Sequence, residues 1–327
     1  MSADTMRAVV QDTFGGPEAL RVAEVARPVP LPTEVLVRVH AAGINPVDWK
    51  TRDGSGMAGL LGEPPFTLGW DVSGVVEEVG FGVTTLKAGD EVYGMPWFPR
   101  AANAYAEYVT APARQFARKP ATLDHVHAAA VPLAALTAWQ AVVDTAQVRA
   151  GQRVLVTAAA GGVGHFAVQF ARHLGAHVVA TASAARHPWL KELGADEVID
   201  YTGTRFEDAT AGIDVVIDLV GDDHDLTSIR SLKVLRPGGL LVAVPAGVSP
   251  ELAAAAEAVG VRVTPFLVEP DGTALTTIAA LIDAGEVAVE VERTFPLEQA
   301  GAAHARGEAG RTRGKLVLTT EVGPGAN

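Results

Sequence analysis

Residues 153–175 read RVLVTAAAGGVGHFAVQFARHLG. The β-branched run at 154–157 predicts a strand, and the glycine-rich segment after it predicts a turn. From Val163 onward apolar residues recur at helical spacing, and Gly175 stands where a left-handed residue would end the helix. A strand, a glycine turn and an amphipathic helix in immediate succession favour a dinucleotide-binding unit.

The turn contains residue types that suit a phosphate. Unpaired N–H groups and about half an elementary charge at the N-terminus of a helix favour an anion there. Gly161 and Gly162 lack a Cβ, so their backbone can approach a pyrophosphate, and Gly164 would let helix and strand pack closely. The first position of the usual G-x-G-x-x-G motif is a glycine, but in this chain it is occupied by Ala159. This indicates that the turn needs no positive φ at that position. We therefore expect the phosphate-binding segment to comprise Ala160, Gly161, Gly162, Val163 and Gly164.

Composition places the chain among ordinary globular proteins. Its 327 residues suffice for two domains, with 48% hydrophobic and 20% charged residues. A net charge of -12 disfavours a nucleic-acid partner, and the complete absence of cysteine excludes disulfides and thiolate chemistry. No window resembles a membrane span, and the first residues contain no apolar signal core, so we expect no membrane association and a cytoplasmic location.

Two patterns follow each other along the chain. Short strand-like segments separated by glycine and proline occur at 7–11, 20–25, 34–40, 74–79, 91–93 and 105–110. A helix-like run at 128–143, opened by Pro132, leads to the glycine turn, after which strands at 176–182, 197–201, 213–220, 240–244 and 262–267 alternate with helices. This alternation predicts an α/β fold with a doubly wound parallel sheet. We expect a Rossmann domain at 126–270 and a β-rich domain at 1–125 and 271–327.

The second strand of the sheet indicates which nicotinamide cofactor binds. An acid about 20 residues after the glycine turn would bind the ribose of NAD, but residues 181–186 read TASAAR and contain none. Ser183 offers a hydroxyl and Arg186 a bidentate cation for a 2′-phosphate. The sequence therefore predicts a preference for NADPH.

Together these motifs resemble those of the zinc-independent medium-chain dehydrogenases/reductases, specifically the quinone oxidoreductase group that includes zeta-crystallin and plant enone reductases. The resemblance spans essentially the whole chain. Each matching fragment alone is only weakly specific for the family, but their order and spacing together are strong support for it. The fragments are AGINPVDWK at 42–50, GWDVSGVV at 69–76, GDEV at 89–92, YAEYV at 105–109, GAD at 194–196, FLVEP at 266–270 and RGK at 313–315. The resemblance implies a GroES-like fold for the β-rich domain and a homodimer.

The chain departs from the zinc-containing alcohol dehydrogenases where they bind their metal. Their ligand Cys corresponds to Asn45, and their Gly-His-Glu motif corresponds to residues 69–71, Gly-Trp-Asp. Asn and Trp do not supply the ligands that zinc prefers, so we expect no metal site. Without a metal, oxidation of an unactivated alcohol is difficult. Hydride transfer from NADPH to a quinone or an α,β-unsaturated ketone is better suited, because such acceptors are already electrophilic.

The resemblance also implies site residues. Asn45 and Lys50 are the candidate catalytic donors to the developing oxyanion, with a surface position as the alternative for Lys50; Asp48 is expected to hold their loop. Candidate cofactor contacts beyond the turn are Thr137, Ser183, Arg186, Tyr201, Val220, Gly221, Pro245, Ala246, Phe266, Leu267, Val268, Arg313 and Lys315. Packing is the alternative for the apolar members. An apolar acceptor pocket formed by Trp49, Met57, Trp70, Trp97 and Phe98 is a further possibility, against plain packing. His165 follows the turn, and we expect it to be an exposed helix residue.

Two other functions stay open at this point. Within enzymes, the rival is a reductase of aldehydes or enoyl thioesters. From another class, the rival is a non-catalytic NADPH-binding protein of the crystallin kind, because the candidate site lacks an unmistakable acid and base pair.

Overall fold

The computed structural model describes residues 5–223, 225–245 and 247–320. The chain forms two compact units, each with hydrophobic clusters of its own. The first unit comprises Met1–Leu136, Glu269–Gly285 and Val289–Asn327, and the second comprises Thr137–Val268 and Glu286–Ala288. The boundary expected at residue 126 therefore lies at residue 137. No helix of the described ranges is long and apolar enough to cross a bilayer.

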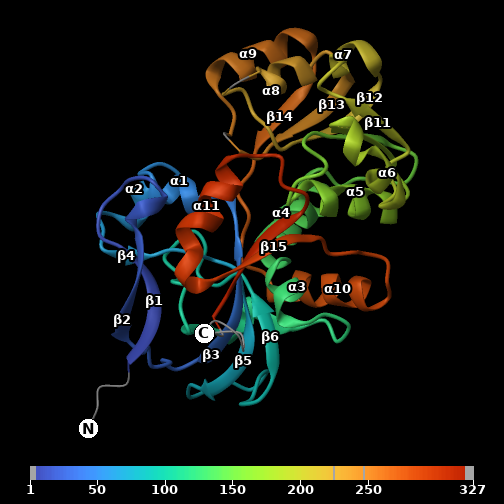
Figure 1. The fold of residues 1–327 in the computed structure, drawn as a ribbon. Coiled ribbons are helices and arrows are strands. Elements are labelled where there is room, and N and C mark those ends of the chain that lie inside the picture. Colours follow the sequence, from blue (N-terminus) through green and yellow to red (C-terminus); the bar gives the residue numbers. More distant parts are fainter. Residues whose placement is uncertain (1–4, 224, 246, 321–327) are drawn as a thin grey trace. The chain divides into compact units, whose positions relative to one another are not determined.

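The second unit is built on a six-stranded parallel sheet (Figure 1). Its strands are β9 (Arg153–Val156), β10 (His177–Ala182), β11 (Glu197–Asp200), β12 (Ile213–Asp218), β13 (Leu235–Ala243) and β14 (Arg262–Pro265). They lie in the order β11-β10-β9-β12-β13-β14, so the chain winds outward from β9 and then restarts on its other side. This order confirms the predicted doubly wound fold.

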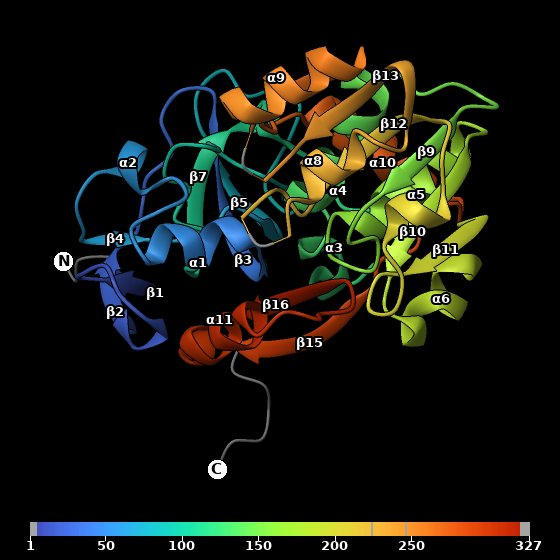
Figure 2. The same cartoon turned by 90° about the horizontal axis from the view of Figure 1, so that it is seen from above.

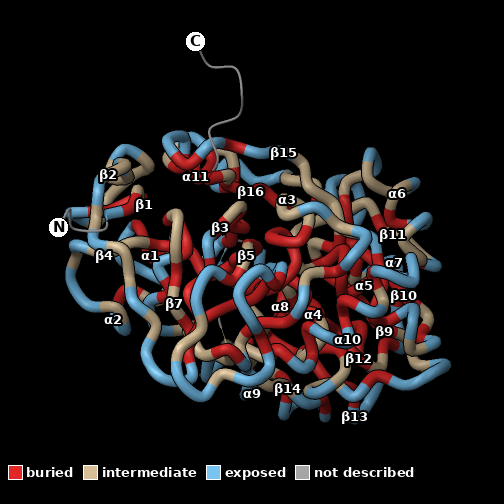
Figure 3. The backbone as a smooth tube through the Cα atoms, turned by 90° about the horizontal axis from the view of Figure 1, so that it is seen from below, coloured by how far each residue is buried: buried red, intermediate tan, exposed pale blue. Residues whose placement is uncertain are grey.

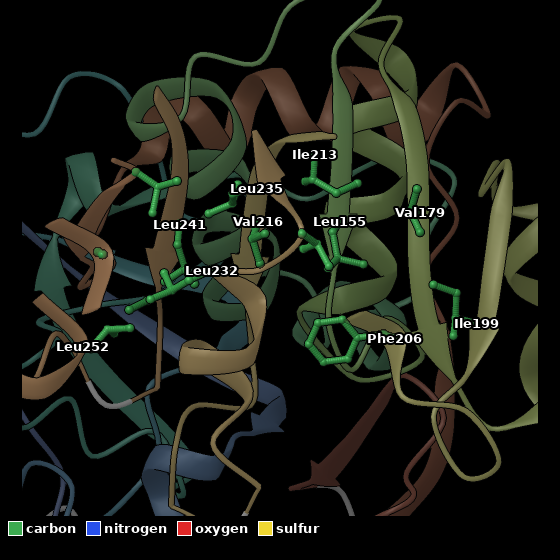
Figure 4. Packing of buried hydrophobic residues seen from close by; sticks show 14 residues of the cluster. Leu155, Val179, Ile199, Phe206, Ile213, Val216, Leu232, Leu235, Leu241 and Leu252 are labelled. Carbon is green, nitrogen blue, oxygen red and sulfur yellow. The ribbon is translucent and has the colours of Figure 1, made fainter. Parts of the chain in front are cut away.

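Helices cover both faces of this sheet because its strands are apolar on both faces. They are α5 (Gly164–His173), α6 (His187–Glu192), α7 (Phe206–Ala209), α8 (Thr227–Ser231) and α9 (Pro250–Val259). On one face Leu155, Val179, Val216 and Leu241 meet side chains of α7 and α9, as Figure 4 shows. Helix α5 packs on β9 and β10, with its whole segment 164–171 buried (Figure 3).

The first unit contains two sheets. The smaller has the order β2-β1-β4, from β1 (Thr5–Gln11), β2 (Leu20–Ala26) and β4 (Phe66–Thr67). The larger has the order β15-β16-β3-β5-β6-β8, with β7 also paired to β3. Its strands are β3 (Glu34–Ile44), β5 (Val72–Val79), β6 (Glu91–Gly94), β7 (Tyr108–Pro112), β8 (Phe116–Arg118), β15 (Val291–Pro296) and β16 (Lys315–Thr319).

The helices of the first unit range from four to twelve residues. They are α1 (Pro46–Arg52), α2 (Ala58–Leu61), α3 (His125–Ala129), α10 (Gly272–Asp283) and α11 (Ala300–Glu308), and α4 (Pro132–Trp139) continues into the second unit. Strand β16 pairs antiparallel with β3, placing Leu316 opposite Ile44, and parallel with β15 (Figure 2). The predicted return of the final strand to the β-rich unit is thus confirmed.

Two predicted elements differ from the structure. The helix expected at 128–143 is split into α3 and α4, because Pro132 lacks an N–H and starts a new helix; the segment Gln140–Thr145 that follows is π-helical. The strand expected at 105–110 begins only at Tyr108. Before it, Ala106 forms a single bridge to Ala8 of the smaller sheet, so the chain passes between two sheets there.

Candidate functional site

The glycine turn closes over the end of β9. Ala158 has a positive φ of 46°, and the Gly161 N–H donates to the Ala158 carbonyl at 3.0 Å. The Ala159 N–H donates to Thr181 O on β10 at 3.0 Å, and Ala159 has no positive φ. The left-handed residue of the turn is therefore Ala158, one position before the residue that the sequence register singles out. Gly175, with a φ of 79°, ends α5 as predicted.

Gly164 is required by packing. A Cβ at this position would lie 2.5 Å from the Ala158 carbonyl oxygen and 2.6 Å from the Ala159 Cα, and both are backbone atoms that cannot move aside. At Gly161 the nearest atom to such a Cβ is the Ala158 oxygen at 3.3 Å. Packing therefore accounts for Gly164, and leaves Gly161 with a much weaker steric reason to be glycine.

The N-terminus of α5 has backbone N–H groups without hydrogen-bond acceptors among the described residues. Within the described part of the chain, the N–H groups of Gly162 and Val163 find no hydrogen-bond acceptor, and no side chain caps the helix. Two unpaired N–H groups at the positive end of a helix suit a phosphate oxygen. The residues present thus fit the pyrophosphate of a dinucleotide.

His165 is buried, contrary to the expectation of an exposed helix residue. Its Nδ1 lies 3.0 Å from the Gly161 carbonyl oxygen, and its ring stacks on Trp189 with centroids 6.1 Å apart. The side chain supports the turn from inside the unit.

The other candidates of the second unit follow the carboxyl ends of its strands. Each comes directly after a strand or close to its end: Ser183 after β10, Tyr201 after β11, Val220 and Gly221 after β12, Pro245 after β13, and Phe266, Leu267 and Val268 after β14. Thr137 is the exception, because it is buried on α4. Because the strands are parallel, these ends share one edge of the sheet. Tyr201, Val220 and Leu267 are exposed there, by 54%, 40% and 55%. Ala246 lies outside the described residues.

Asp218 organises this edge, and the sequence reasoning missed it. Its Oδ1 accepts hydrogen bonds from Thr157 Oγ1 at 3.0 Å and from the Val220 and Gly221 N–H groups at 3.0 and 3.3 Å. Its Oδ2 accepts from Ser228 Oγ at 2.5 Å. The only sequence signal is an acid that ends an apolar strand. Asp218 joins the loops after β9 and β12, the two central strands.

A carboxylate also stands beside the Ser183 and Arg186 turn. Asp200, the last residue of β11, accepts from Thr202 Oγ1 at 2.7 Å, which holds the pKa of its carboxyl below the usual value, and it also accepts from the Ala184 N–H. The Arg186 N–H donates to the Ser183 carbonyl at 2.9 Å, forming the turn. The sequence reasoning looked for an acid on the second strand and overlooked one on the third.

In the first unit, Asn45, Asp71 and Lys315 form a buried cluster, here called the Lys315 cluster. Their side chains are 2%, 0% and 3% exposed. The Lys315 ammonium donates to the Ile44 carbonyl at 2.9 Å, to Asp71 Oδ2 at 3.2 Å and to Asn45 Oδ1. Asn45 Nδ2 donates to Asp71 Oδ2 at 2.8 Å. All three ammonium hydrogens have acceptors, so a structural role replaces the predicted cofactor contact of Lys315.

Arg313 is likewise engaged within the first unit. Its N–H donates to Glu292 Oε2 at 2.7 Å, and its Nε lies 2.9 Å from Glu290 Oε1. Two acids at the start of the preceding strand region therefore hold Arg313, and its contact with the cofactor stays a prediction.

Helix α1 presents the two candidate catalytic residues differently. Asn45 is its N-cap, and the Asn45 N–H donates to Asp48 Oδ2 at 2.6 Å, as expected of a loop-holding Asp48. Lys50 is half-buried, and its ammonium has no hydrogen bond or ion pair with any residue that the structure describes. Asn45 is thus committed to its neighbours, whereas Lys50 keeps its charge available.

Four of the five aromatic and apolar candidates have different surroundings. Trp70 is buried, packs edge-on against Phe98 and donates from Nε1 to the Arg100 carbonyl at 2.7 Å. Trp49 packs against His304. Trp97 lines a hollow of about 600 Å³ beside the smaller sheet, which none of the other four lines. Packing explains most of this set.

Comparisons with known proteins agree with this geometry. A family model described as an alcohol dehydrogenase GroES-like domain matches residues 31–121, and one described as a zinc-binding dehydrogenase matches residues 193–318. The NADPH-dependent alkenal/one oxidoreductase of Arabidopsis thaliana is 35% identical, over 96% of this chain and 79% of that protein. The chain belongs to the medium-chain dehydrogenase/reductase superfamily.

Solved structures place it in the quinone oxidoreductase group of the superfamily. The quinone oxidoreductase from Coxiella burnetii has a TM-score of 0.91 and 38% identity, covering 97% of this chain and 100% of that one. The Escherichia coli quinone oxidoreductase, solved with NADPH, has a TM-score of 0.84 and 30% identity, covering 96% and 99%. The predicted family and its GroES-like and Rossmann folds are confirmed.

The residues of this superfamily member do not fit a catalytic zinc. Asn45 Oδ1 and Asp71 Oδ2, at the positions of the zinc-binding motifs, both accept from the Lys315 ammonium. Trp70 offers only an N–H, which is already donated. Among the residues that the structure describes, no three His, Asp or Glu side chains gather as metal ligands. One matching family model is described as zinc-binding. In this chain, however, the side chains at the zinc-binding positions are hydrogen-bonded to the Lys315 ammonium.

Proposed function

We propose that this protein is an NADPH-dependent oxidoreductase that transfers hydride to quinones or α,β-unsaturated carbonyl compounds without a metal ion. The observation that carries the proposal is the uncapped start of α5 behind the glycine turn, with the unpaired N–H groups of Gly162 and Val163. The related alkenal/one and quinone oxidoreductases support the substrate class.

The second unit is proposed to hold the cofactor. The turn residues would bind the pyrophosphate, and Ser183 and Arg186 the 2′-phosphate of the adenosine ribose. Tyr201 would lie along the adenosine, while Val220, Pro245 and Leu267 offer exposed apolar surface for the nicotinamide riboside. NADPH, when bound, supplies the hydride.

The first unit is proposed to steady the acceptor. When hydride reaches an enone or a quinone, negative charge develops on the acceptor oxygen, and a nearby cation stabilises it. Lys50 is the candidate, because its ammonium is not engaged by any described residue. Asn45 holds the start of α1 through Asp48 and the Lys315 cluster.

An acceptor panel tests the proposal. NADPH oxidation is followed with quinones, 2-alkenals, cyclic enones, simple aldehydes and an enoyl thioester. Turnover with quinones or enones, reduced about tenfold to a hundredfold in Lys50→Ala, is expected from loss of one charge-assisted hydrogen bond. The exposed Lys87→Ala is the control and should match the parent protein. Turnover confined to aldehydes or thioesters would favour the rival reductase, and tight NADPH binding without turnover would favour a binding protein.

We also propose a homodimer in the cytoplasm. Strand β14 is an edge of the six-stranded sheet, and an exposed apolar side chain, Val259, lies just before it. Edge strands of this kind pair readily with a second copy. Sedimentation equilibrium tests the dimer.

The cytoplasmic location needs a test of its own. Because the Arabidopsis relative is named as chloroplastic, cell fractionation is needed to test the location.

A further inference from the structure

Three buried polar side chains of the second unit meet at the carboxyl ends of its two central strands. They are Thr157, which follows β9, Asp218, which ends β12, and Ser228 on α8, and we call them the Asp218 network. Their exposed fractions are 1%, 0% and 3%. Polar side chains in such a core are costly unless each is hydrogen-bonded. The network therefore depends on the bonds that its members make.

The strand register brings Thr157 and Asp218 together. Strands β9 and β12 pair parallel, with Val156 opposite Ile217, and the Thr157 N–H donates to the Ile217 carbonyl at 3.2 Å. Thr157 and Asp218 are the next residues along the two strands, and Thr157 Oγ1 donates to Asp218 Oδ1 at 3.0 Å. This side-chain bond joins the strands one residue beyond their last backbone pair.

The same two side chains bind the loop that follows β12. The Thr157 hydroxyl oxygen accepts the Leu219 N–H at 2.8 Å. Asp218 Oδ1 accepts the Val220 and Gly221 N–H groups at 3.0 and 3.3 Å. Gly221 has a φ of 81°, a conformation that favours glycine. The N–H groups of all three residues at 219–221 are thus held by the network.

Helix α8 holds Asp218 from its other side. Its Oδ2 accepts from Ser228 Oγ at 2.5 Å, so both oxygens of the carboxylate are hydrogen-bonded. A buried polar network whose members are all satisfied is rigid. We therefore expect the Asp218 carboxylate to keep one orientation, and the loop at 219–221 to keep one position relative to β9.

The end of β9 that the network holds is also the beginning of the glycine turn. Ala158 and Ala159 follow Thr157 directly, and their N–H groups donate to Thr181 Oγ1 at 3.2 Å and to the Thr181 carbonyl at 3.0 Å. The strand order restarts between β9 and β12. In open α/β sheets a ligand binds outside the strand ends at such a point. A dinucleotide bound there would contact the glycine turn and the loop at 219–221 together.

We propose that Thr157 and Asp218 are positioning residues, which set the spacing between the glycine turn and the loop at 219–221. This inference rests on the proposed function, in which the turn binds the pyrophosphate of NADPH and the loop flanks its nicotinamide riboside. A ligand that binds at two places gains affinity when the protein holds those places at the matching distance. Binding of the nicotinamide half should therefore depend on the network, and binding of the adenosine half should not.

Thr157→Val tests this division, because it keeps the shape of the side chain and removes the hydroxyl. Calorimetric titration compares NADPH with 2′-phosphoadenosine 5′-diphosphate, which has the pyrophosphate but lacks the nicotinamide riboside. We expect NADPH to bind about tenfold more weakly than to the parent protein, and the adenosine nucleotide to bind within about twofold. Thr157→Ser keeps the hydroxyl and should bind NADPH like the parent protein.

Thr227→Val is the matched control. Thr227 lies on α8 and is 5% exposed, and its hydroxyl makes no hydrogen bond to the residues that the structure describes. Both nucleotides should bind this variant as they bind the parent protein. Equal weakening of the two nucleotides in Thr157→Val would indicate a general loss of structure and would overturn the proposal. Unchanged NADPH affinity in Thr157→Val would overturn it as well.

Ser228→Ala decides the question if Thr157→Val does not fold. It removes the partner of Asp218 Oδ2 and leaves the glycine turn unchanged. NADPH affinity should fall about threefold with no change for the adenosine nucleotide, and an unchanged ratio would overturn the proposal.

These titrations need no turnover, so the two proposals can fail separately. If the parent protein binds both nucleotides but reduces no acceptor, the proposed reaction fails while the affinity ratio still reports on the network. If an acceptor is reduced but the ratio is the same in every variant, only the positioning role fails. A parent protein that binds neither nucleotide would overturn both.

Discussion

Lys315 shows how one side chain can hold a site together. Its ammonium is 3% exposed and donates to Asn45, Asp71 and the Ile44 carbonyl. Asp71 is fully buried, and its other oxygen accepts from the Leu133 N–H at 2.6 Å. Both oxygens of this carboxylate are therefore hydrogen-bonded, one to the Lys315 ammonium and the Asn45 amide and the other to the backbone.

Lys315→Met should lower thermal stability strongly. Removing one partner of a buried ion pair costs about 3 to 5 kcal/mol, because the other charge is left uncompensated. The double variant Lys315→Met with Asp71→Asn should recover part of the loss, and the exposed Lys87→Met serves as control. Differential scanning calorimetry measures all four proteins. A single variant as stable as the parent would contradict a charged Lys315 cluster.

We expect the charge of Arg186 to set the preference for NADPH over NADH. Arg186→Ala should weaken NADPH binding about tenfold to a hundredfold while changing NADH affinity little, since a charge-assisted bond to phosphate contributes roughly 1.5 to 3 kcal/mol. Lys191→Ala removes an exposed cation from α6 and should leave the ratio unchanged. Fluorescence titration with both nucleotides gives the ratio. The nearby Asp200 carboxylate opposes a 2′-phosphate, so an unchanged ratio in Arg186→Ala would mean that NADPH is not preferred at this turn.

Single residues were predictable only where their neighbours in sequence reveal them. The loss of the zinc-binding Cys at Asn45 is visible in the sequence, but its partners lie 26 and 270 residues away. No local sequence pattern predicts contacts between residues so far apart in the chain. The same holds for Tyr105 and His304, whose separation is 199 residues.

At the scale of elements, two glycines of the glycine turn have different roles: Gly164 is required for packing, and Gly161 is expected to serve cofactor binding. Gly164→Ala should destabilise the second unit by about 1 to 3 kcal/mol, because its Cβ would meet backbone of Ala158 and Ala159. Gly161→Ala should leave stability within about 0.5 kcal/mol and weaken NADPH binding. Gly203, whose Cβ would meet open space, provides the control Gly203→Ala. Equal losses of stability in the Gly161 and Gly164 variants would contradict this division.

The element pattern was readable because periodicity is a local property. Alternating strands and helices after residue 150 predicted the parallel sheet, and its strand order follows from the winding rules. Boundaries failed where a tertiary contact intervened. Tyr105 looked like strand by composition, yet its hydroxyl bonds to His304 and the strand begins three residues later.

At the scale of the whole molecule, activity should not depend on a metal. Dialysis against a chelator should leave turnover and thermal stability unchanged, because Lys315 already neutralises Asp71. Elemental analysis of the purified protein measures bound zinc, and zinc added after dialysis should produce no gain. About one tightly bound zinc per chain, surviving gel filtration, would contradict the assignment.

The order of synthesis gives the Lys315 cluster one more consequence. Lys315 leaves the ribosome 270 residues after Asn45, a delay of roughly 15 to 55 seconds at ordinary translation rates. Until then the buried carboxylate of Asp71 has no counter-ion, and β3 lacks the strand β16 beside it. A chain released early would have the whole cofactor-binding unit but an unfinished partner unit. The Lys315 cluster therefore cannot close until β16 has been synthesised.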